Sequence, residues 1–182
     1  MDLFGFSEND IITYHDFFEK DDFSAILDYL NRPMWLWGHN SLNENDPDKP
    51  KYATPFWKMH LNEEYFFTKY LLNIIENKTD QKFHLDRCYC NGHTYGTSGL
   101  FHEDWYDDMG RTVLLYANKT WRQEWGGKTV FDLNGKYHYN EFIPNSIVMF
   151  PGVIPHRAET TTRAFLGLRK TVAWKLLLKD KR

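Results

Sequence analysis

Two histidine motifs, His102-Glu-Asp104 and Pro155-His156-Arg157, enclose the most informative stretch of this sequence. Between them the chain reads Arg111-Thr-Val-Leu-Leu-Tyr-Ala-Asn-Lys-Thr-Trp121 and then Gly126-Gly-Lys-Thr-Val-Phe131. Alternate residues of a β-strand share one face, so on an extended strand His102 and Asp104 point together while Glu103 points away. With His156 from a distant strand, they would offer two imidazoles and one carboxylate to a single metal ion, which is the facial set of non-haem iron sites.

Strand-like alternation surrounds these motifs throughout the second half of the chain. Turn-forming pairs such as Asn134-Gly135 and Pro151-Gly152 separate the alternating runs. We interpret Gly126-Gly127 as a further hairpin turn or a bulge. The expected strands are Phe83–Cys90, Thr112–Tyr116, Lys128–Leu133, Ser146–Phe150 and Arg169–Leu178.

The first half of the chain predicts helices instead. A short strand at Ile11–Tyr14 precedes a helix that Asp21 or Asp22 caps, and a second amphipathic helix covers Asn62–Asn77. The intervening stretch Met34–Pro55, rich in proline, asparagine and aspartate, predicts a loop with little regular structure.

Helices followed by antiparallel-looking strands predict a mainly β protein with flanking helices. We expect a double-stranded β-helix, or jelly-roll, barrel that is supported by the N-terminal helices. We expect a single domain over residues 1–182, in which 1–80 form the supporting helices and loop and 81–182 the barrel core with the metal site.

Composition narrows the classes of function. The 182 residues carry a formal net charge of −3 and a pI near 6.2, which makes a nucleic-acid partner unattractive because no broad basic surface is available. No run is apolar enough to cross a bilayer and the N-terminus does not look like a signal peptide, so we expect a cytoplasmic protein without a membrane partner. Cys88 and Cys90 lack the second pair that a structural zinc site needs, and we expect buried reduced thiols.

From Phe83 to Leu178 the chain resembles the Fe(II)- and 2-oxoglutarate-dependent oxygenases, and within them the prolyl 4-hydroxylase-like branch. The matching elements keep the family's order and are His102-Glu-Asp104, Arg111–Tyr116-Ala-Asn118, Trp121, Gly126–Phe131, His156 and Arg169. The resemblance implies a dioxygenase in which His102, Asp104 and His156 form the metal-binding and catalytic centre. It implies Fe(II), 2-oxoglutarate as cosubstrate and O2, and it admits ascorbate as a further cofactor.

The resemblance also implies a basic residue that pairs with the distal carboxylate of 2-oxoglutarate. Arg169 suits this role because a planar guanidinium grips a carboxylate through two parallel hydrogen bonds, and Thr171 on the same face adds a hydroxyl. In this branch the basic residue stands six positions before a tryptophan, whereas Arg169 is one position closer to Trp174. Lys170 and Arg163 therefore remain alternatives.

Two tyrosines and one histidine have more than one interpretation. Tyr116 and Tyr95 correspond to tyrosines that the family uses around the cosubstrate, but Tyr116 is also suited to the core. His93 is the rival metal ligand. Two other classes of function stay open: a jelly-roll protein that binds a ligand without turnover, and a zinc hydrolase, which would need a general base that an outward-pointing Glu103 does not supply.

The nearest resemblance favours a prolyl residue in a peptide or protein as substrate. Trp35, Trp37 and Trp57 could form an aromatic wall for an extended peptide, or could cover the junction between helices and barrel. The alternative substrate is a free amino acid or other small metabolite, held by a second charged group from Arg87 or Arg111. We include Trp174 with these two arginines among the expected substrate-binding residues.

Overall fold

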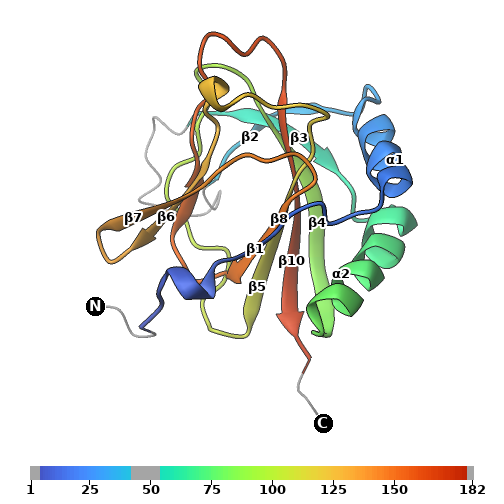
Figure 1. The fold of residues 1–182 in the computed structure, drawn as a ribbon, viewed down its shortest axis with the longest axis vertical. Helices are drawn as coiled ribbons and strands as arrows, with labels where there is room; N and C mark the ends of the chain where they lie inside the picture. The colour runs from blue at the N-terminus through green and yellow to red at the C-terminus, as the bar shows by residue number, and fades with distance from the viewer. Residues whose placement is uncertain (1–4, 42–53, 180–182) are drawn as a thin grey trace.

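The structure, a computed structural model, describes residues 5–41 and 54–179 and consists mainly of two β-sheets (Figure 1). The larger sheet has seven strands in the order β1 (Ile12–Tyr14), β8 (Ile147–Pro151), β5 (Gly110–Tyr116), β10 (Arg169–Leu178), β4 (Phe83–His93), β3 (Phe56–His60) and β2 (Leu36–His39). The smaller sheet has three in the order β7 (Lys136–Asn140), β6 (Thr129–Leu133) and β9 (His156–Ala158).

The arrangement of the sheets confirms the predicted jelly-roll architecture. Neighbouring strands are antiparallel in both sheets, and strands distant in sequence, such as β4 and β10, lie side by side. The smaller sheet lies across one face of the larger sheet, and the helices cover the other face (Figure 1). The space between the two sheets is where a buried site can form.

Two apolar clusters, one on each face of the larger sheet, stabilise this arrangement. On β10, Val172, Trp174 and Leu176 belong to the cluster beneath the helices, whereas Ala173 belongs to the cluster between the sheets. The alternation follows from strand geometry, because successive side chains point to opposite faces. The face that a β10 residue occupies therefore decides whether it supports the fold or borders the space between the sheets.

The N-terminal helices form close to their predicted positions. Helix α1 (Lys20–Leu30) follows β1 as expected, but the predicted capping is wrong: Glu19 is the N-cap residue and its side chain makes no capping hydrogen bond. Asp21 and Asp22 lie inside the first turn, where carboxylates favour the positive end of the helix dipole. The second predicted helix begins as a π-helix, η2 (Phe66–Leu71), and continues as α2 (Leu72–Thr79).

The expected loop Met34–Pro55 is wrong at one end. Residues 36–39 form β2, which pairs with β3 and so extends the larger sheet, while 42–53 lie outside the described residues. The composition of this stretch hid the strand, since proline, glycine and asparagine are depleted in strands in general. In contrast, Asn134-Gly135 closes the β6–β7 hairpin as predicted, and both residues have positive φ, as a tight hairpin turn requires.

Cys88 and Cys90 are buried and free, as predicted. Burial raises the pKa of both thiols, so both stay protonated near neutral pH. Among the described residues, no helix is long and apolar enough to cross a membrane.

Candidate metal centre

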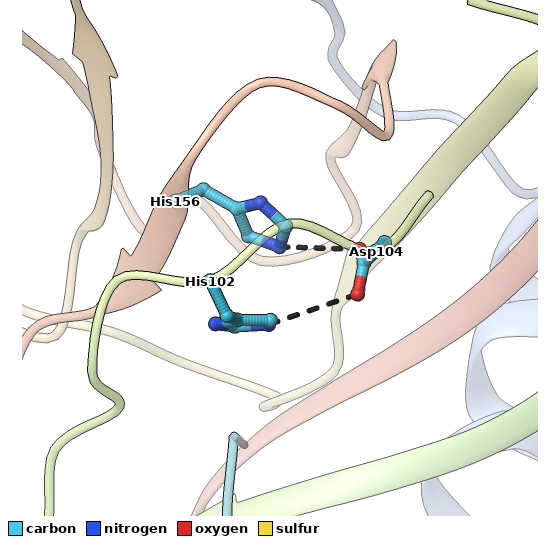
Figure 2. Close-up of side chains that lie close together, drawn as sticks. All are labelled: His102, Asp104 and His156. Carbon is cyan, nitrogen blue, oxygen red and sulfur yellow. Dashed lines mark ion pairs between the residues drawn. The ribbon is translucent and has the colours of Figure 1, made fainter. Parts of the chain in front are cut away.

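His102, Asp104 and His156 come together between the two sheets (Figure 2). His102 is not part of a regular strand, so the strand expected at this motif is wrong. It forms an isolated bridge with His156, in which each backbone N–H donates to the other's carbonyl over 3.1 and 3.0 Å. The backbone N–H of Asp104 donates to Gly152 at 2.7 Å, and this bond turns the chain so that the carboxylate approaches both imidazoles.

The three side chains have the geometry of a metal-binding group. The Nε2 atom of His156 lies 3.2 Å from one carboxylate oxygen of Asp104, and that of His102 lies 3.7 Å from the other. Their ligand atoms all lie within 4.8 Å of one another. Among the residues that the structure describes, this is the group of histidine, cysteine and acidic side chains suited to hold a metal ion.

Backbone carbonyls set the orientation of both imidazoles. The Nδ1 atoms of His102 and His156 each lie 2.9 Å from a carbonyl oxygen, of Leu100 and Ile154 respectively. In a neutral imidazole this makes Nδ1 the donor and leaves the Nε2 lone pair directed at the shared centre, which is the arrangement of metal-bound histidines. The donor set and its anchoring fit Fe(II), for which two histidines and one carboxylate leave coordination positions open.

The protonation states also suit metal binding. Burial, with a further contribution from His156, lowers the pKa of His102 to about 4, so this imidazole is neutral near pH 7. Burial alone would raise the pKa of Asp104, but the Lys175 ammonium and the two histidines outweigh it and hold that pKa well below its usual range. A neutral imidazole and an ionised carboxylate are the forms that bind metals.

Lys175 is a residue of this centre that the sequence did not bring to notice. It is 2% exposed, and its ammonium donates to the same Asp104 oxygen that accepts a 2.6 Å hydrogen bond from the Thr112 hydroxyl. Period-two alternation from Arg169 places residues 171, 173 and 175 on one face of β10, which is the signal that could have found it. Lys175 also occupies the position six after Arg169, where the resemblance had pointed to a tryptophan.

A cavity of about 470 Å³ adjoins the metal centre and extends between β4, β10 and the smaller sheet. Arg169 and Thr171 border it, as their shared strand face predicts, and Arg169 is 1% exposed. Burial lowers the pKa of this guanidinium to about 10, so it remains charged near neutral pH. No carboxylate lies within ion-pair distance of Arg169 among the described residues, and a buried cation without a counter-ion is costly unless a ligand supplies one.

Lys170 and Arg163, the alternatives to Arg169, do not border this cavity. Lys170 lies on the other face of β10 and donates to the Asn31 side chain at 2.9 Å. The Nε atom of Arg163 donates to the hydroxyl of Tyr95, a half-exposed residue, at 3.1 Å. Tyr95 does not border the cavity either.

The glycine pair Gly126-Gly127, for which we expected a hairpin turn or a bulge, closes no hairpin and positions Arg169. It connects η3 (Gln123–Trp125) to β6, and the carbonyl oxygen of Gly127 accepts a 2.6 Å hydrogen bond from the Nε of Arg169. Gly127 has a φ of +75°, and a Cβ there would lie 3.0 Å from the Cδ of Arg169. A side chain at Gly127 would therefore crowd the arginine.

His93 borders the cavity beside Arg169, with which it pairs across β4 and β10. It is 2% exposed, and neither of its ring nitrogens has a hydrogen-bond partner among the described residues. Burial, followed by the nearby Arg169 charge, lowers its pKa well below the usual range. His93 does not belong to the metal group, and its two unpartnered nitrogens are buried polar atoms at this end of the cavity.

Three further expected site residues lie outside the cavity. The hydroxyl of Tyr116 donates to Thr129 and accepts from Asn140, both at 2.9 Å, so Tyr116 supports the cavity wall from within the core. Trp174 faces the helices and donates to the Phe67 carbonyl at 3.0 Å, because it lies on the opposite face of β10 from Arg169. The Arg111 guanidinium bonds to backbone carbonyls in its own turn, those of Asp108 and Gly110.

The mouth of the cavity is polar and carries both signs of charge. Arg87 borders it as expected and forms an ion pair with Asp86 at 3.5 Å, and Glu103 is exposed there. None of the three tryptophans of the expected aromatic wall borders the cavity. Other aromatic residues do, among them Tyr106, which is exposed, and Trp105, whose ring packs against Gly110 and Gly152. Trp35 packs against the helix-side core instead, which is the alternative that the sequence left open.

Comparison by sequence finds no relative of this chain: no protein-family profile matches it, and no curated protein does. Comparison by structure finds several. A prolyl hydroxylase from Trichoplax adhaerens, in complex with a hypoxia inducible factor oxygen degradation domain peptide fragment, has a TM-score of 0.71 at 14% identity, over 93% of this chain and 84% of that one. A prolyl-4-hydroxylase from Pseudomonas putida has a TM-score of 0.66 at 16% identity, over 93% and 92%.

A third similar structure is an oxidoreductase of the 2OG-Fe(II) oxygenase family from Burkholderia pseudomallei. Its TM-score is 0.69 at 11% identity, and the similarity covers 96% of this chain and 90% of that one. At these identities the similarity establishes the fold, and the chemistry has to be argued from the residues of the site.

Proposed function

We propose that this chain is an Fe(II)- and 2-oxoglutarate-dependent dioxygenase that hydroxylates an unactivated C–H bond, with a prolyl residue of a peptide or protein as its substrate. The observation that carries the proposal is the pairing of two groups in one cavity. At one place His102, Asp104 and His156 offer three metal ligands, and at another the buried Arg169 lacks a carboxylate partner. A divalent metal and an anionic ligand would satisfy both at once.

Each group has a role that follows from its contacts. His102, Asp104 and His156 would hold iron, and Arg169 would receive the distal carboxylate of 2-oxoglutarate, assisted by the Thr171 hydroxyl at the same wall. Bound iron and 2-oxoglutarate would supply the oxidation, with O2 consumed and succinate and CO2 released. The protein's contribution is to orient these reactants and to exclude water from the space between the sheets.

A peptide substrate is supported by the surroundings of the cavity. Its lining combines the exposed aromatic side chain of Tyr106 with hydrogen-bonding and charged groups, as suits an extended chain presenting one residue. The Trichoplax enzyme of similar fold binds a peptide fragment. The net charge of −3 offers little to a nucleic acid.

Succinate release tests the proposal directly. The purified chain with Fe(II), 2-oxoglutarate, O2 and ascorbate would be given proline-rich peptides, free amino acids and short oligonucleotides. We expect succinate together with a peptide product heavier by one oxygen, and neither with the His156→Ala variant. Turnover of a free amino acid or an oligonucleotide without turnover of any prolyl peptide would contradict the peptide assignment and leave the dioxygenase assignment standing.

The second candidate is hydroxylation of a small metabolite. Arg87 favours it, because its guanidinium borders the cavity mouth and could bind a substrate carboxylate. In that case Arg87→Ala should raise KM for a free amino acid. A ligand-binding protein without turnover would instead bind 2-oxoglutarate and release no succinate with any of the three substrate classes.

A further inference from the structure

Lys175 is a buried cation in contact with the proposed metal ligand Asp104. Its side chain is 2% exposed, and lysine is seldom buried to this extent unless it is paired. The pair is set by two elements, because β10 supplies the ammonium and the turn after His102 supplies the carboxylate. The Lys175 ammonium also lies 3.4 Å from the Thr112 hydroxyl, so both donors converge on one oxygen of Asp104.

A metal ion bound at this centre would have to share that carboxylate with the ammonium. Asp104 is the acidic residue with which Lys175 forms an ion pair among the described residues, and no second carboxylate belongs to the metal group. The other carboxylates that border the cavity, Asp86 and Glu103, lie at its mouth, where water screens them. The ammonium therefore keeps its positive charge close to the metal position, with one negative charge between them.

We propose that Lys175 is the internal counter-ion of Asp104 in the metal-free protein, and that the metal binds against its charge. The site then binds a divalent cation weakly by itself and strongly when a dicarboxylate is present. The role of Lys175 as counter-ion needs only the metal site, whereas the effect of the dicarboxylate rests on the proposed function.

The charges of the buried groups carry this argument. Lys175 and Arg169 are buried and face the cavity, so together with Asp104 the buried charged groups of the metal-free site carry one excess positive charge. A divalent cation raises the excess to three, and a 2-oxoglutarate dianion returns it to one. Charges in a site of low dielectric interact strongly, so the metal and the dianion should each favour the other's binding.

Binding of Mn²⁺, followed by the EPR signal of the free ion at pH 7.5, tests the proposal. We would compare the natural protein, Lys175→Met, Lys175→Gln and, as a matched control, Lys170→Met, which removes a lysine from the other face of the same strand. We expect both Lys175 variants to bind Mn²⁺ alone at least about tenfold more tightly, with Lys170→Met unchanged. The increase in Mn²⁺ affinity on adding 2-oxoglutarate should be smaller in both Lys175 variants than in the natural protein.

Thermal unfolding provides a second readout. Metal-free Lys175→Met should melt below the natural protein because Asp104 loses its counter-ion, and saturating Mn²⁺ should raise its Tm by more. If Lys175→Met does not fold without metal, Lys175→Gln keeps a neutral donor towards Asp104 and gives the same comparison.

Each contrary outcome has a distinct meaning. Equal or weaker Mn²⁺ binding by both Lys175 variants would overturn the counter-ion and show that Lys175 only orients Asp104. If the natural protein bound Mn²⁺ no better than His156→Ala, the metal site itself would be wrong, and the proposed function and this inference would both fall. Tighter Mn²⁺ binding by the variants without any effect of 2-oxoglutarate would retain the counter-ion and overturn its link to the dicarboxylate.

Discussion

Two backbone carbonyls, those of Leu100 and Ile154, orient the two histidines of the proposed metal centre. Each carbonyl accepts a hydrogen bond from Nδ1, which fixes the tautomer of His102 and His156 and leaves the Nε2 lone pair free to bind a metal ion. The mutual bridge between the two backbones fixes their spacing in addition. Metal affinity should therefore depend on the presence of both imidazoles.

Removing one imidazole is the first test at the scale of single residues. His156→Ala should weaken Fe(II) or Mn²⁺ binding by more than about tenfold. Replacing a residue that only hydrogen-bonds to a metal ligand already lowers metal affinity about tenfold, and His156 is itself a proposed ligand. Metal content after equilibrium dialysis measures the loss. Glu103→Ala is the control, because Glu103 is exposed and lies outside the metal group. Unchanged metal loading of His156→Ala would show that the ion binds elsewhere.

The second test concerns the buried guanidinium. Arg169→Ala should weaken 2-oxoglutarate binding to the Mn²⁺-loaded protein by roughly 2–4 kcal/mol, because it removes charge-assisted hydrogen bonds and leaves a carboxylate unpaired. Calorimetric titration measures this. Lys170→Ala should change the affinity little, since its side chain lies on the other face of the strand. A large loss in Lys170→Ala with none in Arg169→Ala would reverse the assignment.

Short-range patterns identified the candidate ligands better than their surroundings. His102 and Asp104 were recognised by spacing and order, although the strand used to explain their proximity is absent. Lys175 was missed, since a lysine in an alternating strand looks like a solvated residue until its buried partner is known. Trp174 was placed in the site by its distance from Arg169 along the chain, which does not specify a strand face on its own.

At the scale of elements, β10 has one face for stability and one for chemistry. Trp174→Ala should lower the free energy of unfolding by about 3–5 kcal/mol, because a large, fully buried side chain leaves a cavity beneath the helices. Urea denaturation measures it. Affinity for 2-oxoglutarate should be unchanged in the folded variant. A variant with lost affinity and natural stability would place Trp174 in the site after all.

Alanine substitutions at Gly127 and Gly135, two glycines in different turns, form a matched pair. Gly127→Ala and Gly135→Ala both place a side chain at positive φ, which costs about 1 kcal/mol or more. At Gly135 the new Cβ meets nothing within 4 Å, whereas at Gly127 it would lie 3.0 Å from the Cδ of Arg169. We therefore expect reduced 2-oxoglutarate affinity in Gly127→Ala alone, by calorimetric titration. Equal affinities in the two variants would show that Arg169 tolerates the crowding.

Element prediction succeeded where one local signal dominated. Alternation identified β4, β5, β6, β8 and β10, and Asn134-Gly135 identified a hairpin, because these depend on neighbouring residues. Strand β2 was missed since its pairing with β3 comes from the whole sheet and its own sequence, Leu36-Trp-Gly-His39, is short and contains glycine. The π-helical turn at η2 likewise has no signal in helical periodicity.

For the molecule as a whole, the cavity wall contains imidazoles that stay neutral by burial. Burial, aided by Lys58, lowers the pKa of His39 to about 4, and burial and Arg169 lower that of His93 well below its usual range. A histidine in the unfolded chain has a pKa near 6.5. Between pH 6.5 and 4, His39 and His93 are therefore protonated in the unfolded state and neutral in the native state. Stability should therefore fall as the pH drops through this window.

Thermal unfolding of the metal-free protein at pH 7 and pH 5 measures this effect. The natural protein should lose Tm at pH 5, and His93→Asn should lose less, because the substitution removes one of the groups responsible. His84→Asn is the control, because His84 is exposed on β4. The fall in Tm of this variant from pH 7 to pH 5 should equal that of the natural protein. The same fall in Tm for His93→Asn and the natural protein would contradict the explanation.

The overall fold could be predicted from the order of motifs even though no related sequence is found. The ligand motifs, strands and turns occur in the order of the family that the chain resembles. A jelly roll with this order brings β9 next to the segment around His102. How the mouth of the cavity is lined could not be predicted, because it depends on loops from both halves of the chain. Tyr106, which borders the cavity in place of the expected tryptophans, is an example.

A crystal structure of the protein with Mn²⁺ and 2-oxoglutarate, grown without O2 and measured for anomalous scattering, tests the central claim most directly. We predict one anomalous peak in contact with the Nε2 atoms of His102 and His156 and with the Asp104 carboxylate. We also predict one dicarboxylate that reaches from this ion to Arg169. A peak at another place, or a dicarboxylate away from Arg169, would contradict the account.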